Sequence, residues 1–236
     1  MPPRPPRRPW FFLALALLFM ALAVLGFSRS FLVPLASGDF TRGTRVVVHG
    51  VLLFAWFSLL LAQAALAATR RMAWHRRLGW VGAALVVPIF LSGVHVSAVV
   101  AAPAGGGPIG AGQLSVLAGA TFTFALFLVL ATAAVLVRRA PQAHKRLLVF
   151  ATLLLLGAAV ARIPWLAAYA EWVDLGVLGL VIAHDLVRLR RLHLATLLAG
   201  GAFLFDAYAV PPLKRTPEAQ ALARQLLVAM DLVPPG

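Results

Sequence analysis

The chain is divided into apolar runs of about twenty residues, the length at which a helix spans the hydrocarbon core of a bilayer. Hydrophobic residues make up 62% of the sequence and charged residues only 12%, whereas about a quarter of the residues in a globular protein are charged. The alternating segments of about ten residues that build a membrane β-barrel are absent from the sequence. The sequence therefore predicts an all-α, polytopic transmembrane helical bundle.

The apolar runs and the turns between them predict about seven helices. They form a transmembrane domain at 10–210, which follows a basic tail at 1–9, and a polar connection at 28–44 separates the first two helices. The first apolar run is long and no A-x-A cleavage site follows it, so we favour a retained helix over a cleaved signal peptide. The expected helices cover residues 10–27, 44–69, 78–102, 113–137, 144–163, 165–189 and 192–210.

The last segment, 211–236, is expected to be an extracytoplasmic tail with a short amphipathic helix. Thr216, Pro217 and Glu218 are typical of a helix start, because proline is favoured at the first helical position. An apolar stripe at helical spacing then predicts a helix that lies on the membrane or on a partner. The stripe consists of Ala219, Leu222, Leu226 and Met230.

Basic residues are concentrated in the turns on one side of the predicted bundle. That side carries fourteen of the 21 lysines and arginines but only one of the seven acidic residues, Asp185. The positive-inside rule makes this side cytoplasmic, which places the N-terminus inside and the C-terminus outside. Short basic turns of this kind contact anionic lipid headgroups, so the net charge of +14 does not indicate a nucleic-acid partner.

The turn at Thr69–Trp80 concentrates four arginines around His75 and is repeated downstream. His144-Lys145-Arg146 forms the second copy, and Arg190–His193 forms a degenerate third. The favoured interpretation is that these clusters set the topology and bind lipid, with the histidines at the interface. The alternative is that His75 and His144 are neighbours that bind a cofactor or relay protons.

Three segments at these turns carry a resemblance to known proteins. HRRLGWVGAAL, HKRLLVFATLLLL and RLRRLHLATL resemble an uncharacterised group of bacterial multi-pass inner-membrane proteins, over most of residues 45–200. This resemblance implies location in the bacterial cytoplasmic (inner) membrane. Histidines at the ends of successive helices are also remotely similar to b-type transmembrane cytochromes, and that resemblance implies haem b and electron transfer.

Two further histidines lie at matching depths in the opposite, outer half of the bundle. His49 and His95 are each about a turn and a half from the outer end of antiparallel helices, with aromatic residues around them. Imidazole is a common haem ligand, so both are candidate axial ligands of one haem b. The chain has no cysteine, which excludes covalent haem attachment, disulfides and thiolate metal sites. The alternative is that each histidine hydrogen-bonds a neighbouring helix.

Charged residues also converge on the outer half, where they are costly inside a membrane. They could form a substrate site, or Arg162 could pair with an acid of the next helix and pin the two helices together. On the cytoplasmic side, Asp185 is expected to form a salt bridge with Arg146 or Arg188, or to orient His184. The outer cluster consists of Arg162, Glu171, Asp174 and Asp206.

Three classes of function remain open at this point. The protein could be a haem-binding electron carrier, a transporter or channel for a small molecule or ion, or an accessory subunit with a protein partner in the membrane. Sequence motifs of metallohydrolases and serine hydrolases are absent. No residue is therefore assigned as catalytic or as a metal ligand, and enzymatic activity stays undecided.

Overall fold

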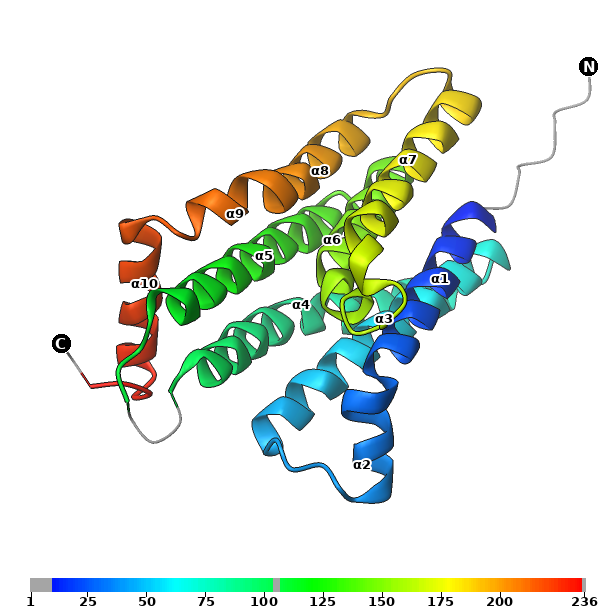
Figure 1. Ribbon diagram of the computed structural model, residues 1–236. Coiled ribbons are helices and arrows are strands. Elements are labelled where there is room, and N and C mark those ends of the chain that lie inside the picture. Colours follow the sequence, from blue (N-terminus) through cyan, green and yellow to red (C-terminus); the bar gives the residue numbers. More distant parts are fainter. Residues whose placement is uncertain (1–9, 104–106, 235–236) are drawn as a thin grey trace, which may run out of the picture.

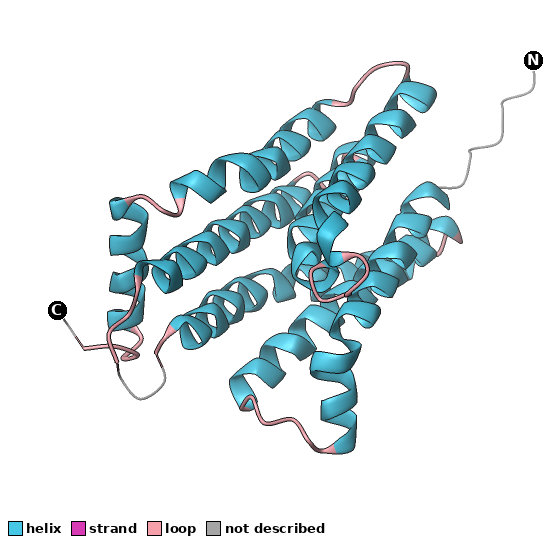
Figure 2. Cartoon of the chain, viewed as in Figure 1, coloured by secondary structure: helices cyan, strands magenta, loops and turns pink. Residues whose placement is uncertain are grey.

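The computed structural model describes residues 10–103 and 107–234, and within these ranges the chain is helical with no strand. The predicted tail at 1–9 lies outside the described residues. The long helices run along one another, joined by short loops, and the start of α1 lies at the opposite end of the bundle from α10 (Figures 1 and 2). They are α1 (Trp10–Phe27), α3 (Thr44–Ala68), α4 (Met72–Ala101), α5 (Ala111–Leu136), α6 (Pro141–Val160), α7 (Ala170–Leu189) and α8 (Leu194–Leu204).

Shorter helical segments extend or connect the long ones. Two of them are π-helical turns, η1 (Ser28–Leu32) after α1 and η4 (Phe205–Ala209) after α8. A 3-10 turn, η3 (Ala167–Tyr169), precedes α7. The remaining segments are α2 (Val33–Ser37), α9 (Val210–Leu213) and α10 (Pro217–Ala229).

Six helical stretches in the described ranges are long and apolar enough to cross a membrane. This confirms the predicted helical class and supports a multi-pass membrane protein. The α7 helix has twenty residues, enough for a crossing, but Glu171, Asp174 and Asp185 lie within it. The six stretches are Trp10–Ser37, Thr44–Ala68, Met72–Ala101, Ala111–Leu136, Pro141–Val160 and Leu194–Leu213.

Two predicted connections are helical in the structure. The first helix continues through η1 and α2 to Ser37, so the polar connection predicted at 28–44 shrinks to residues 38–43. Pro34 directly follows the π-helical turn, and its missing N–H removes a backbone hydrogen bond at the point where regular α-helix is interrupted. The third long helix begins at Met72 instead of 78, because the arginines that flank His75 are good helix formers.

The α6 helix lies at the centre of the bundle and contacts α1, α5 and α8. Twelve of its twenty residues are buried, including Phe150, Leu153 and Leu156, which have no exposed surface. The α1 helix approaches it closely at Gly26. A Cβ atom on Gly26 would lie only 2.2 Å from the carbonyl oxygen of Ala159. Glycine is therefore required here because the backbones of α1 and α6 touch.

The amphipathic helix of the tail, α10, packs on its own bundle. Ala219, Ala223 and Leu227 are buried in a small apolar cluster with residues of α4 and α5. The hydroxyl of Thr216 accepts a hydrogen bond from the backbone N–H of Ala219 (3.3 Å), which caps the helix as its sequence suggested. The predicted apolar stripe differs from the buried face, because Leu222 is half exposed and Ala223 and Leu227 take the inner positions.

The turns that carry the repeated basic motif meet at one end of the bundle, here called the arginine-rich end. It comprises the α3–α4 turn at 69–71, the α5–α6 turn at 137–140 and the α7–α8 connection at 190–193. The Arg138 guanidinium lies over the Trp80 ring (5.3 Å), and the Lys145 ammonium lies over Phe12 of α1 (4.2 Å). These contacts connect the α5–α6 hairpin to α4 and to α1.

Exposed tryptophans and tyrosines mark both ends of the bundle. One group, Trp10, Trp74 and Trp80, lies at the arginine-rich end. The other group lies at the opposite end, around the α6–α7 connection and η4. Aromatic rings with a polar edge favour the two headgroup regions of a bilayer. The second group consists of Trp165, Tyr169, Trp172 and Tyr208.

The close approach of α1 to α6 yields a prediction. Replacing Gly26 by leucine forces the Ala159 backbone away and should destabilise the protein by about 2 kcal/mol, a usual cost of overpacking. Ala21→Leu, on the exposed side of the same helix, should change stability little. Thermal unfolding of both variants in detergent measures the difference, and equal unfolding temperatures would show that the two backbones are not in contact.

Candidate functional site

The repeated histidines at the arginine-rich end both connect adjacent helices. Nδ1 of His75 lies 3.2 Å from the carbonyl oxygen of Gln63, and Nδ1 of His144 lies 2.8 Å from that of Ala134. A carbonyl only accepts, so each imidazole donates from Nδ1 to the last turns of the preceding helix. His75 and His144 also lie close enough for their charges to interact. Their proposed role in cofactor binding or proton relay stays a prediction.

The histidine of the third copy is used differently. Nδ1 of His193 accepts the backbone N–H of Ala195 (3.1 Å) and so caps the N-terminus of α8. Burial, followed by the positive charge of Arg146, lowers the pKa of His193 below its usual value. Both effects favour the neutral imidazole that the cap requires, because a protonated Nδ1 could not accept the hydrogen bond.

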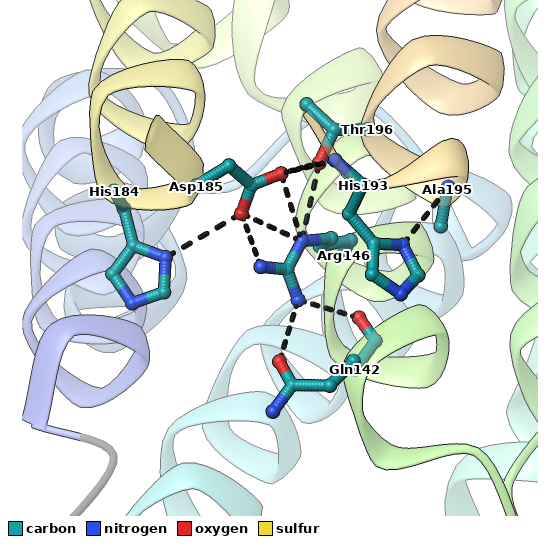
Figure 3. A network of polar contacts seen from close by, with 7 residues as sticks. All are labelled: Gln142, Arg146, His184, Asp185, His193, Ala195 and Thr196. Atoms are coloured by element: carbon teal, nitrogen blue, oxygen red, sulfur yellow. Dashed lines mark hydrogen bonds and ion pairs between the residues drawn. The ribbon is translucent and has the colours of Figure 1, made fainter. Parts of the chain in front are cut away.

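A fully buried ion pair joins three helices next to this cap (Figure 3). Arg146 of α6 and Asp185 of α7 have no exposed side-chain surface. Arg146 Nε lies 3.0 Å from Asp185 Oδ1, and Nη2 contacts the same oxygen. Thr196 of α8 donates its hydroxyl to Asp185 Oδ2 (2.5 Å). The predicted salt bridge of Asp185 is therefore confirmed, with Arg146 as its partner.

The remaining polar atoms of the pair are also satisfied. Arg146 Nη1 donates to the carbonyl oxygen of Gln142 (2.7 Å) and to its side-chain oxygen (2.8 Å). The backbone N–H of His193 donates to Asp185 Oδ2 (3.1 Å). His184 lies on the other side of Asp185 (Figure 3). Its ring stacks on that of Phe11, with the ring centroids 4.2 Å apart. Such complete hydrogen bonding is what makes a buried ion pair tolerable.

This network yields a prediction about stability. Asp185→Asn leaves the Arg146 charge buried and unpaired, which should lower the free energy of unfolding by about 3–5 kcal/mol. The exposed Arg188, three residues away, gives a matched control, and Arg188→Gln should have little effect. The double change Arg146→Met with Asp185→Leu removes both charges and should recover most of the loss. Thermal unfolding in detergent measures these differences. An Asp185→Asn variant as stable as the wild type would show that the buried pair does not stabilise the bundle.

The opposite half of the bundle encloses a cavity of about 830 Å³. Residues of α1, α3, α4, α5 and α6 line it, and so do residues of both π-helical turns, η1 and η4. This volume is within the range of about 300–1,000 Å³ that small-molecule sites occupy. The π-helical turns are relevant because such turns widen a helix locally and frequently occur at functional sites.

The cavity wall is mostly apolar, and a few polar side chains interrupt it. The rings of Phe31 and Phe54 stack in the wall with their centroids 5.9 Å apart. The hydroxyl of Ser30 is buried and has no hydrogen-bond partner in the described part of the chain. An apolar pocket with few polar groups is typical of a site for a small organic molecule. The polar lining residues are Ser30, Arg42, His49, Ser97, Thr123, Arg162 and Asp206.

His49 lies in the cavity wall and bonds the neighbouring helix. Its Nδ1 lies 2.9 Å from the hydroxyl oxygen of Ser92, and that oxygen also lies 3.2 Å from the Ile89 carbonyl. The tautomer of His49 decides which partner donates in the bond to Ser92. His95 lines a different hollow, together with Arg45 and Met230. The structure thus does not bring His49 and His95 into one cavity, and shared haem ligation stays a prediction.

The structure brings part of the predicted outer cluster together, because Asp174 lies close enough to Asp206 for their charges to interact. Arg162 and Asp206 line the cavity; Glu171 accepts the Tyr208 hydroxyl (2.5 Å), and Oδ1 of Asp174 is buried without a hydrogen-bond partner. Arg162 forms no ion pair with these acids in the described ranges. The alternative that Arg162 pins two helices by pairing with Glu171 or Asp174 is therefore not realised in this structure.

Arg162 instead makes contacts that leave most of its charge uncompensated. Its guanidinium lies over the Phe27 ring (5.0 Å to the centroid), and Nη1 donates to the carbonyl oxygen of Ala158. Partial burial, followed by the charge of nearby Arg42, lowers the pKa of Arg162. The sequence analysis missed Arg42 because it lies in a short loop and no motif surrounds it.

Asp206 is better compensated than the arginines. Its Oδ1 accepts the hydroxyl of Thr123 (2.9 Å), and it lies within electrostatic reach of Lys214. The Thr123 hydroxyl also lies 3.2 Å from the Gly119 carbonyl of its own helix, so Thr123 connects α5 to η4. The cavity therefore has one carboxylate that is already bonded and two arginines that are not paired with an acid in the described residues.

Comparisons of the chain with protein-family models, with curated proteins and with solved structures found no match. The resemblance to bacterial inner-membrane proteins and to b-type cytochromes accordingly stays a prediction. The inference of function rests on the geometry of this chain alone.

Proposed function

We propose that the protein crosses a bacterial inner membrane seven times, with the arginine-rich end in the cytoplasm. The positive-inside rule and the aromatic residues at both ends support this placement. The contacts of α7 support a seventh crossing, because Glu171 near its start bonds Tyr208 after α8. Asp185 near its end bonds Arg146 at the start of α6, so α7 runs the length of the bundle.

Reporter fusions test this topology. A reporter active only in the cytoplasm should be inactive when fused after Pro234 and active when inserted in the turn at 138–140. Removing charge at Arg138 and Arg139 should weaken the orientation bias, whereas Arg215→Gln and Arg224→Gln should not. Activity of the fusion after Pro234 would contradict the proposed orientation.

We further propose that the protein binds a small molecule in the cavity of its outer half, as a transporter or carrier does. The observation that carries this proposal is the convergence of both π-helical turns on one apolar cavity with a few polar groups. The other end of the bundle, by contrast, has a buried ion pair that joins three helices and whose polar atoms are hydrogen-bonded. Binding chemistry is therefore assigned to the cavity and structural support to the arginine-rich end.

Blocking the cavity tests this function. Ala120 of α5 lines the cavity, and Ala120→Trp should fill it; Val129→Trp on the exposed side of α5 is the matched control. Protein purified from bacterial membranes should release a small molecule on denaturation, as detected by mass spectrometry. Wild type and Val129→Trp should carry it, and folded Ala120→Trp should have lost it. Equal amounts in all three proteins would contradict the proposal.

The same material also tests the electron-carrier hypothesis. His49 lines the cavity, and imidazole is a common haem ligand, so haem binding remains a hypothesis to test. A haem in the cavity would give a Soret absorbance band that His49→Ala removes. Absence of the band after haem-replete expression would exclude haem binding and leave the transporter or carrier proposal.

A further inference from the structure

Two arginines line the cavity and are exposed at its mouth, without an acidic partner. Arg42 comes from the loop before α3, and Arg162 follows the end of α6. Both are exposed, and neither forms an ion pair in the described part of the chain. Their charges lie close enough to interact, as the effect of Arg42 on Arg162 shows. Two like charges held together attract an anion that can contact both.

The interior behind the arginines is suited to a hydrocarbon chain. Leu53, Phe57 and Leu154 are among the apolar residues that line it. Asp206 is the only acid in the lining that the structure describes, and Thr123 and Lys214 offset its charge. A purely hydrophilic anion would leave this apolar wall unused, whereas an apolar ligand without charge would leave the arginines unpaired.

We propose that the cavity binds an amphiphile with an anionic headgroup, such as a membrane lipid bearing a phosphate. The headgroup contacts Arg42 and Arg162 at the mouth, and the acyl chain occupies the apolar interior. Arginine suits this role because its planar guanidinium can donate two parallel hydrogen bonds to phosphate or carboxylate oxygens. The unpartnered hydroxyl of Ser30 in the same cavity offers a further donor. This inference rests on the proposed binding function and specifies its ligand class.

Three probes and a charge-matched control test the ligand class. Dodecyl phosphate is titrated into the protein in uncharged maltoside micelles, and bound ligand is counted by native mass spectrometry. Dodecyltrimethylammonium has the same chain with a cationic head, and inorganic phosphate has the anion without a chain. Dodecyl phosphate should bind at least about tenfold more tightly than either, because each charge-assisted hydrogen bond contributes substantially.

Substitution of the two arginines should reduce that preference. Arg42→Gln with Arg162→Gln should weaken dodecyl phosphate binding about tenfold or more. Arg45→Gln with Arg215→Gln removes the same charge from exposed positions at the same end of the bundle and should leave affinity unchanged. Equal loss in both double variants would show that bulk charge attracts the probe, and it would overturn the inference.

The remaining outcomes separate this inference from the proposed function. If both amphiphiles bind equally and Ala120→Trp abolishes binding of each, the cavity is a ligand site but the anionic headgroup is wrong. If inorganic phosphate binds as tightly as dodecyl phosphate, the site binds a free anion, and the inference that its ligand is an amphiphile is wrong. If Ala120→Trp leaves dodecyl phosphate binding intact, the cavity is not the site, and the proposed function fails with the inference.

Discussion

The buried ion pair between Arg146 and Asp185 is the interaction on which the arrangement of the second half of the bundle depends. It lies where the start of α6, the end of α7 and the start of α8 meet. The hydroxyl of Thr196 and the backbone N–H of His193 donate to the same carboxylate. A charge buried without its partner costs several kcal/mol, so the three helices are held together at this point. The α7 helix depends on it most, because much of its remaining surface is exposed.

The two ends of the bundle are stabilised in different ways, and the cavity lies at the end where the helices are less regular. At the arginine-rich end, histidines bond backbone carbonyls and cations lie over aromatic rings, and these contacts connect neighbouring helices. At the opposite end, η1 and η4 interrupt regular helix and the helices leave an internal space. A protein that binds a molecule within the membrane needs one rigid region and one region with room for the ligand.

The sequence predicted the class of fold well, because the length of an apolar run and the position of basic turns follow directly from bilayer physics. It predicted the salt bridge of Asp185 because an isolated acid among many arginines has few alternatives. It did not decide between Arg146 and Arg188 as the partner, since both are arginines expected near Asp185. Burial of one of them depends on tertiary packing around α6.

The candidate site was harder to predict than the fold. Depth along a helix can be read from the sequence, and the structure has His49 near the start of α3 and His95 near the end of α4, both away from the arginine-rich turn that joins these helices. The direction in which a side chain faces depends on how helices are rotated, and here the two histidines line different hollows. The π-helical turns have no sequence signature in this chain, so the inward position of Ser30 could not be foreseen. Arg42 was missed because a loop residue has no periodicity.

The central claim is that the cavity of the outer half holds a ligand. An electron cryomicroscopy map of protein purified from bacterial membranes tests it most directly. The account predicts elongated density between η1 and η4, ending in a compact feature within hydrogen-bond distance of Arg42 and Arg162. A well-resolved map in which the surrounding helices close and leave the cavity without density would contradict it.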